Sequence, residues 1–282
     1  MEVPARAKVN LGLAVLGRRP DGYHELHTLF ATLDLADRVA LSPVGRGVEL
    51  RVVGADLPAG EENLAHRAAR AYLGAAGVEA GVRIELRKEI PVAAGLGGGS
   101  ADAAAVLVGM ERLFGAGVDL ASLAGELGAD VPFLLRGGLA EARGTGGELR
   151  HLPAIEAHLV LVNPGFPLST ARVYRELGRG DWGGELAVGA ILEALARGAE
   201  PPWRNDLEAP AFRLRPELAR LKAELAALGL FPLLSGSGPT FLAPLGSRSE
   251  AREAERELSR RYPGYWVRAV RLEGGRGGLE GR

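Results

Sequence analysis

Residues 91–101 are the segment that most restricts how this 282-residue chain can fold. Four of the five residues from 95 to 99 are glycine, and an alanine-rich stretch with the pattern of a helix follows at once. Glycines let a backbone approach a bound group closely, and the first N–H groups of a helix have no partner inside the helix. The sequence therefore predicts a strand, a loop and a helix that together can hold an anion.

This loop does not match two common phosphate-binding patterns. A P-loop ends in Gly-Lys-Ser/Thr, and Ser100 stands where G-x-G-x-x-G has its last glycine. A flexible turn is the alternative, but consecutive glycines cost conformational entropy that a plain turn does not require. We interpret the segment as a third kind of phosphate loop, made of Pro91, Val92, Ala93, Ala94, Gly95, Leu96, Gly97, Gly98, Gly99, Ser100 and Ala101.

Composition and charge exclude several classes of protein. Hydrophobic residues make up 47% of the chain and charged residues 24%, and the net charge of -1 argues against a general nucleic-acid-binding protein. Apolar runs fall short of the ~20 residues of a membrane span, and residues 1–4 lack the features of a signal peptide. The chain has no cysteine, and its five histidines show no metal-binding spacing. We expect a cytoplasmic protein without a nucleic-acid partner, a membrane partner or a protein-built metal site.

The hydrophobic pattern predicts two α+β halves. Alternation at 7–15 predicts a strand with Lys8 and Asn10 on one face. Further strands are expected at 24–33, 38–41, 48–53, 82–86, 158–162, 232–234, 240–243 and 265–272. Helices are expected at 63–76, where Asn63 is the cap, and at 100–114, 120–127, 171–177, 185–197, 216–228 and 249–261. We expect one domain at 1–150, a second at 151–273 and a disordered tail at 274–282.

A few polar and aromatic residues are candidates for chemistry. Only three of the 34 basic residues are lysines, so Lys8 and Lys88 mark places where an ammonium group is required. Asp130 is either a solvated turn residue or, beside Lys8, a carboxylate that stays ionised near a transferred phosphoryl group. Tyr23 and Tyr174 could stack on a ligand ring, although each alone fits an ordinary strand or helix position better.

Five segments in this order resemble the GHMP kinase superfamily, and the resemblance spans nearly the whole chain. They are residues 4–11 with the continuation 19–26, then 91–101, 127–132, 204–208 and 234–238. The stretch Asp21, Gly22, Tyr23 and His24 is most similar to one branch of the superfamily. That branch uses ATP to phosphorylate the 2-hydroxyl of 4-diphosphocytidyl-2-C-methyl-D-erythritol in non-mevalonate isoprenoid biosynthesis.

The resemblance implies an α+β, two-domain GHMP kinase fold with a ribosomal-protein-S5-like N-terminal domain and a ferredoxin-like C-terminal domain. Asp130 would be the catalytic aspartate and general base, and Lys8 the catalytic lysine beside it. ATP would lie with its phosphates on residues 91–101 and would also contact Asn63 and Lys88. Mg²⁺ would accompany the ATP, with Ser100 as its candidate ligand. The small-molecule substrate would contact Asn10, Tyr23, His24, Thr170 and Tyr174.

Other functions remain as alternatives. A different GHMP kinase, acting on mevalonate or homoserine, would keep the ATP loop and change the acceptor, and the Tyr23–His24 segment argues against it. A noncatalytic nucleotide- or RNA-binding module could use the same N-terminal fold. The low net charge and the presence of both Lys8 and Asp130 favour the enzyme.

Overall fold

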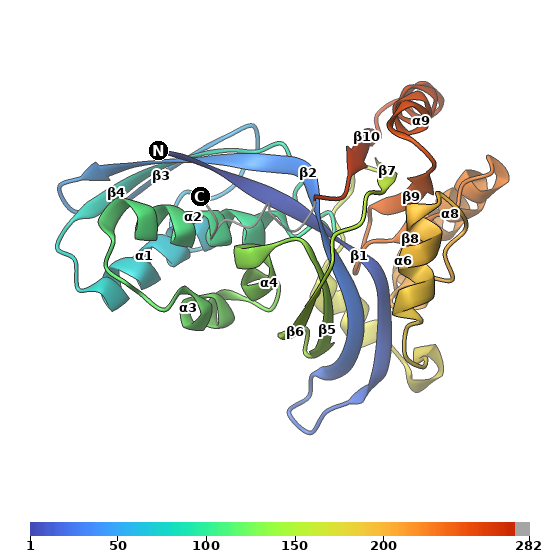
Figure 1. The fold of residues 1–282 in the computed structure, drawn as a ribbon, viewed down its shortest axis with the longest axis horizontal. Coiled ribbons are helices and arrows are strands. Elements are labelled where there is room, and N and C mark those ends of the chain that lie inside the picture. Colours follow the sequence, from blue (N-terminus) through green and yellow to red (C-terminus); the bar gives the residue numbers. More distant parts are fainter. Residues whose placement is uncertain (274–282) are drawn as a thin grey trace.

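A computed structural model describes residues 1–273, and the predicted tail at 274–282 lies outside them. The described strands form two sheets (Figure 1). In the first sheet the order is β3-β4-β2-β5-β6, with β1 paired to β2, and in the second it is β10-β7-β9-β8. Strands of the first sheet are β1 (Glu2–Arg18), β2 (His24–Val44), β3 (Gly47–Val53), β4 (Gly81–Arg87), β5 (Leu139–Gly144) and β6 (Glu148–Leu152). Those of the second are β7 (His158–Asn163), β8 (Leu233–Leu234), β9 (Phe241–Leu245) and β10 (Trp266–Arg271).

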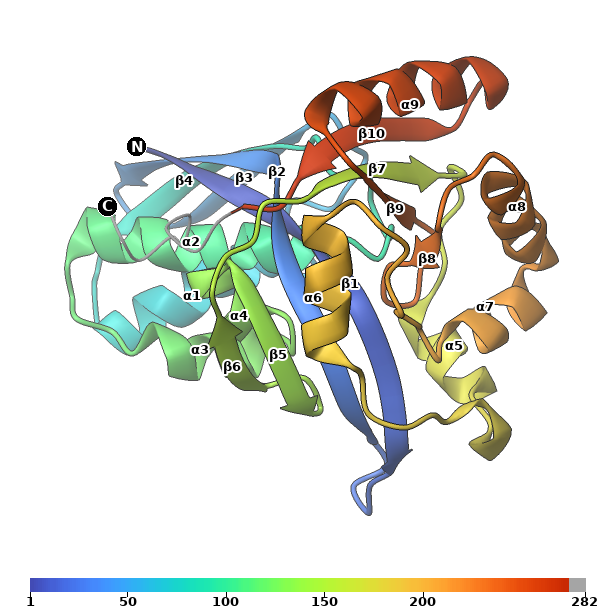
Figure 2. The same ribbon diagram turned by 45° about the vertical axis from the view of Figure 1, so that its right-hand side comes forward.

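The helices divide between the two sheets in chain order. The N-terminal helices are α1 (Leu64–Ala76), α2 (Gly98–Phe114), α3 (Leu120–Leu127) and α4 (Val131–Arg136), and they gather on one side of β2, β3 and β4 (Figure 1). The later helices are α5 (Thr170–Glu176), α6 (Val188–Ala196), α7 (Glu208–Leu214), α8 (Pro216–Ala227) and α9 (Arg248–Arg261). Figure 2 shows α9 lying along β10 and β7. Among residues 1–273, no helix is long and apolar enough to span a membrane.

The central element of the first half is α2. Every residue from Ala101 to Met110 in this helix is buried. Its small side chains let it lie close to the strands, and a Cβ atom at Gly109 would lie only 2.3 Å from Leu41 Cδ1 of β2. Because protein interiors are closely packed, this contact sets the position of α2 and therefore of the loop before it.

A continuous hydrophobic core joins the two sheets. Ala7, Val9 and Leu11 of β1 share one buried cluster with Leu161 of β7 and Leu242 of β9. Backbone contacts add to this junction, since the N–H of Glu273 donates to the Thr32 carbonyl at 2.8 Å. Side chains from both halves are therefore held in fixed relative positions. The chain passes from one sheet to the other between Leu152 and His158. The domain boundary at residue 150 stays a prediction.

The structure confirms most of the predicted elements and corrects several. The helix predicted at 120–127 has these bounds, and those at 63–76 and 249–261 differ by one residue at their starts. The strands predicted at 24–33 and 38–41 are wrong as separate elements, because β2 is one continuous strand of 21 residues. The helix after the loop begins at Gly98 rather than Ser100, and α4, α7, β5 and β6 were not predicted.

Candidate active site

Strand β1 and helix α4 bring Lys8 and Asp130 together. The Lys8 ammonium lies 3.2 Å from Asp130 Oδ2, with side chains 7% and 30% exposed. Asp130 is the residue that precedes α4, which places its carboxylate at the edge of the interior. The pair therefore combines a buried positive charge with a carboxylate that solvent or a ligand can reach.

Neighbouring side chains fix the direction of the Lys8 ammonium. Its Nζ donates to Asn10 Oδ1 at 2.9 Å and lies 5.0 Å from the centre of the Phe30 ring. Asn10 Nδ2 donates to Thr28 Oγ1 at 2.8 Å, and that hydroxyl donates to the Gly12 carbonyl at 2.7 Å. Because each group has a partner, the buried network is held in one arrangement.

The glycine-rich loop passes directly over Lys8. The N–H of Lys8 donates to the Leu96 carbonyl at 2.9 Å, and Gly97, the N-cap of α2, has φ +67°. No side chain caps α2, so its first N–H groups are not taken by a capping group. A Cβ atom at the exposed Gly99 would meet nothing within 4 Å. This open, uncapped helix start beside Lys8 fits the phosphates of ATP.

A second loop, at residues 235–238, supports the first. Ser235 Oγ donates to the Gly95 carbonyl at 3.0 Å, and a Cβ atom at Gly95 would lie 2.3 Å from the Ser235 carbonyl oxygen. Asn205 holds this second loop, because its Nδ2 donates to the carbonyls of Leu234 and Gly236 at 2.7 and 2.6 Å. Two segments that are far apart in the chain thus form one support for the predicted phosphate site.

Lys88 lies beneath the start of α2 in a buried charged cluster. Its ammonium contacts Asp37 and lies 2.6 Å from Asp102 Oδ2. Burial, and after it the nearby Asp37 charge, raise the pKa of the Asp102 carboxyl to about 7, while the Lys88 ammonium opposes the rise. A Cβ atom at Gly98 would lie 3.4 Å from Lys88 Nζ. Lys88 therefore supports the loop from below, and its predicted contact with ATP stays a prediction.

Asn63 caps α1, as the sequence predicts. Its Oδ1 accepts from the N–H of Ala65 at 3.0 Å, and its Nδ2 donates to the Pro58 carbonyl at 2.9 Å. Both ends of the amide are therefore engaged within the chain. A contact between Asn63 and ATP stays a prediction.

Four of the five predicted substrate residues lie at the tip of the β1–β2 hairpin or on α5, and Asn10 lies on β1 beside Lys8. His24 and Tyr174 are stacked, with ring centres 5.4 Å apart, whereas Tyr23 is 67% exposed. Burial, followed by the nearby Asp130 charge, raises the pKa of the Tyr174 hydroxyl. Thr170 Oγ1 lies 2.7 Å from Ser237 Oγ and so belongs with the second loop. The structure brings His24 and Tyr174 together near Asp130 and leaves Tyr23 at the surface.

Several supporting residues were not predicted to act at the site. Asn205 and Ser235 lie in the segments 204–208 and 234–238, which were quoted for the resemblance without a role for these two side chains. Thr28, Asp37 and Asp102 become part of the site only through buried contacts with Asn10 or Lys88. The position of Asp102, just after the glycines, is the one signal in the sequence.

Comparisons with known proteins show the family to which the chain belongs. The model of the GHMP kinases N terminal domain matches residues 63–138, and that of the GHMP kinases C terminal domain matches 187–264. A Thermus thermophilus protein named 4-diphosphocytidyl-2-C-methyl-D-erythritol kinase is 53% identical over 92% of each chain. One of the same name from Deinococcus radiodurans is 46% identical over 95% of this chain and 92% of its own.

Solved structures give the same result. One match is a crystal structure of 4-(cytidine 5'-diphospho)-2C-methyl-D-erythritol kinase, whose sequence is 52% identical to this chain. The two structures superpose with a TM-score of 0.89, and the match covers 98% of this chain and 100% of the other. A homoserine kinase from Cytophaga hutchinsonii shares the fold at 22% identity, with a TM-score of 0.73 and coverage of 99% and 96%. The predicted α+β, two-domain GHMP kinase fold is confirmed. The chain belongs to the GHMP kinases, and within them to the family of the 4-diphosphocytidyl-2-C-methyl-D-erythritol kinases.

Proposed function

We propose that this protein transfers the γ-phosphoryl group of ATP to the 2-hydroxyl of 4-diphosphocytidyl-2-C-methyl-D-erythritol, giving the 2-phosphate and ADP. The reaction is a step of non-mevalonate isoprenoid biosynthesis, and we expect it to take place in the cytoplasm. The observation that carries the proposal is the Lys8–Asp130 pair at 3.2 Å, next to the uncapped start of α2. The relatives' printed names supply the acceptor.

In the proposed mechanism, positioning and electrostatic stabilisation supply most of the rate. The N–H groups at the start of α2 hold the phosphates of ATP, and Asp130 lies where it can accept the proton of the 2-hydroxyl. The hydroxyl oxygen forms a bond to the γ-phosphorus as the bond from that phosphorus to the ADP oxygen breaks. The Lys8 ammonium, 3.2 Å from Asp130, stabilises the negative charge that develops on the transferred group.

Mg²⁺ would accompany ATP, and it would neutralise charge on the phosphate oxygens when bound. Within residues 1–273, no group of three or more His, Asp or Glu side chains could hold a metal ion. This donor set fits an ion held mainly by phosphates and water, with the Ser100 hydroxyl as the candidate protein ligand.

For the acceptor, we propose that the cytosine ring stacks on Tyr174 and Tyr23, and that His24 hydrogen-bonds its edge. His24 now covers one face of the Tyr174 ring, so stacking of a base on that face requires the His24 ring to move. Asn10 and Thr170 would face the methylerythritol unit. Both side chains are already held in place, by Thr28 and Ser237 respectively.

A coupled assay of ADP release tests the proposal. The protein is given Mg-ATP with 4-diphosphocytidyl-2-C-methyl-D-erythritol, mevalonate or homoserine, and Asp130→Asn is compared with Asp56→Asn, a change at an exposed aspartate. We expect release only with the cytidyl substrate and its loss in Asp130→Asn, while ATP affinity is kept. Release with another acceptor would contradict the substrate, and ATP binding without any acceptor-stimulated release would favour the noncatalytic module.

A further inference from the structure

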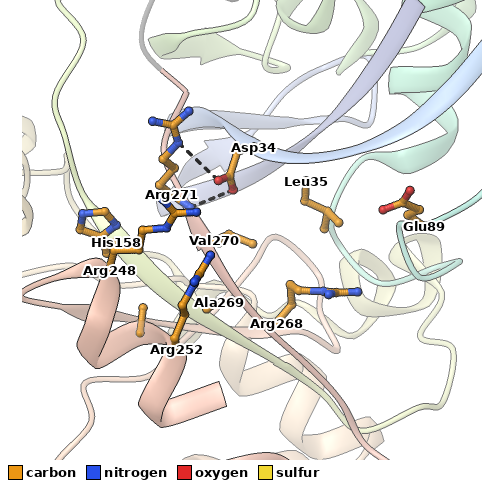
Figure 3. A pocket seen from close by; sticks show the side chains of 11 residues that line it. Asp34, Leu35, Glu89, His158, Arg248, Arg252, Arg268, Ala269, Val270 and Arg271 are labelled. Atoms are coloured by element: carbon orange, nitrogen blue, oxygen red, sulfur yellow. Dashed lines mark hydrogen bonds and ion pairs between the residues drawn. The ribbon is translucent and has the colours of Figure 1, made fainter. Parts of the chain in front are cut away.

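A cavity of about 240 Å³ lies where α9 meets strands of both sheets (Figure 3). Eleven residues of β2, β7, α9, β10 and the segment after β4 line it. None of these residues belongs to the candidate active site. The cavity is therefore a separate feature of the junction between the two halves.

Among the residues that line this cavity, four arginines outnumber two carboxylates. Each of the two carboxylates lies beside an arginine other than Arg248, Arg252 and Arg268. Asp34 accepts from the N–H of Arg271 at 2.9 Å, and its Oδ2 lies 3.4 Å from that arginine's Nε. Glu89 lies 3.9 Å from Arg38, which is outside the cavity. Outside the lining, Glu156 lies 3.6 Å from His158, and Glu273 lies 3.6 Å from Arg271, the arginine that also pairs with Asp34.

Three arginines of the lining are left without such a partner. Arg248, Arg252 and Arg268 form no ion pair within the described part of the chain. In Figure 3, the side chains of Arg248 and Arg252 extend from α9 toward β2 and β10. In a chain whose net charge is -1, this is a local accumulation of positive charge rather than a general property.

The placement of two of these arginines is unfavourable for the helix itself. Arg248 is the first residue of α9, and Arg252 lies one turn later on the same face. Two like charges at this spacing repel each other, and a cation near a helix N-terminus opposes the helix dipole. A bound anion would offset both effects, because it would attract the guanidinium groups and the positive end of the dipole together.

The rest of the lining gives the cavity a floor. Leu35, Ala251 and Val270 are 6%, 1% and 5% exposed, so they close the cavity on its inner side. An anion on this floor would be partly shielded from water, which strengthens its interaction with charged donors. Guanidinium groups present paired N–H donors that match the oxygens of a phosphate group.

We propose that this cavity binds a small anion of the phosphate or diphosphate class through Arg248, Arg252 and Arg268. The ligand would join Arg248 and Arg252 of α9 to Arg268 of β10 and so stabilise the packing of this helix on the second sheet. The site is independent of the proposed kinase reaction.

Calorimetric titration of the full-length protein with inorganic diphosphate tests this site, with the α2 phosphate loop first saturated by Mg-ATP. Parallel titrations use inorganic phosphate and methylenediphosphonate, an organic diphosphate without a base, at equal ionic strength, which distinguishes free anions from an organic diphosphate. The variants are Arg248→Ser and Arg252→Ser, with Arg256→Ser as the control, since Arg256 is an exposed arginine of α9 outside the cavity.

We expect diphosphate to bind the unmodified protein and Arg256→Ser with the same Kd and to raise their thermal midpoints. In Arg248→Ser and Arg252→Ser the Kd should rise at least tenfold, while ADP release with the kinase substrate stays unchanged. An equal Kd in all four proteins would overturn the proposal. Disappearance of binding once Mg-ATP saturates the active site would overturn it as well, because the anion would then occupy the α2 loop.

Discussion

The side chain of Lys8 passes directly beneath Gly97. A Cβ atom at Gly97 would lie 2.8 Å from Lys8 Cγ and 3.1 Å from its Cε, and Gly97 has φ +67°. A side chain here would therefore both strain the backbone and displace the lysine. The proposed phosphate loop and the lysine beside Asp130 are therefore packed directly against each other.

This contact predicts the effect of Gly97→Ala. The left-handed conformation costs a non-glycine residue ~1–2 kcal/mol, and a shift of the Lys8 ammonium by about 1 Å can lower turnover ~100-fold. We expect a lower thermal midpoint and a larger loss in kcat than in substrate affinity. Steady-state kinetics and thermal unfolding measure both effects. Gly74→Ala, in the last turn of α1 with nothing within 4 Å of the new Cβ, should keep full activity.

The Lys8 ammonium occupies a space that an arginine cannot fill in the same way. It is buried among Asn10, Phe30 and Asp130, so a longer planar guanidinium group would displace at least one of them. We expect Lys8→Arg to lower kcat by ~100-fold or more, on the scale of losing one electrostatic donor. The control is Lys222→Arg, at a partly exposed lysine whose ammonium pairs with Glu208 of α7 and contacts neither Lys8 nor Asp130. Equal activity in the two variants would count against the role of Lys8.

The elements that the sequence predicted well carry local signals. Asn63 accepts from the N–H of Ala65, and this cap marks the start of α1 in the sequence as well as in the structure. The elements that the sequence did not predict depend on contacts with residues far away in the chain. Strand β5 is glycine-flanked and has no alternating pattern, yet it is buried because it pairs with β2 on one side and β6 on the other.

The break that the sequence indicated in β2 has a similar origin. Two aspartates, Asp34 and Asp37, lie in the middle of that strand and are typical of a turn. In the structure Asp37 is fully buried, because Lys88 and the N–H groups of Glu89 and Ile90 satisfy its carboxylate. A pattern in the local sequence cannot show hydrogen-bond partners that are some 50 positions away in the chain. The same limit applies to the 3.2 Å contact of Lys8 with Asp130, which spacing alone could not give.

Asn205 offers a test of the link between the two loops. Its removal by Asn205→Ala leaves the carbonyls of Leu234 and Gly236 without this donor and the N–H of Leu207 without its acceptor at 2.9 Å. Each unsatisfied buried group costs about 1–3 kcal/mol, so we expect a clear loss of unfolding free energy. The KM for ATP should also rise, because residues 235–238 support Gly95.

The control for this change is Tyr72→Phe. Tyr72 is also buried, and its hydroxyl donates to Glu111 at 2.8 Å, a contact that involves neither residues 91–101 nor residues 235–238. Urea unfolding should show a loss of stability in both variants. A rise of the KM for ATP in both, or in neither, would show that Asn205 does not act through the second loop.

The buried cluster of Lys88, Asp37 and Asp102 predicts a dependence of stability on pH. Asp102 has a pKa of about 7 in the folded protein, against an ordinary value of 3.8, with burial as the main cause. The folded state therefore holds a proton that the unfolded state has lost, and stability falls as pH rises from about 4 to about 7. An asparagine at this position is uncharged at every pH, so Asp102→Asn should remove this part of the loss. The variant should gain in unfolding free energy relative to the unmodified protein as pH rises, by on the order of a few kcal/mol at pH 8.

Urea unfolding at pH 5 and pH 8 measures the difference, with Asp56→Asn as the control at an exposed position. Curves for Asp102→Asn and the unmodified protein that stay parallel across this range would mean that Asp102 is ionised in the folded protein throughout, with Lys88 outweighing the cost of burial.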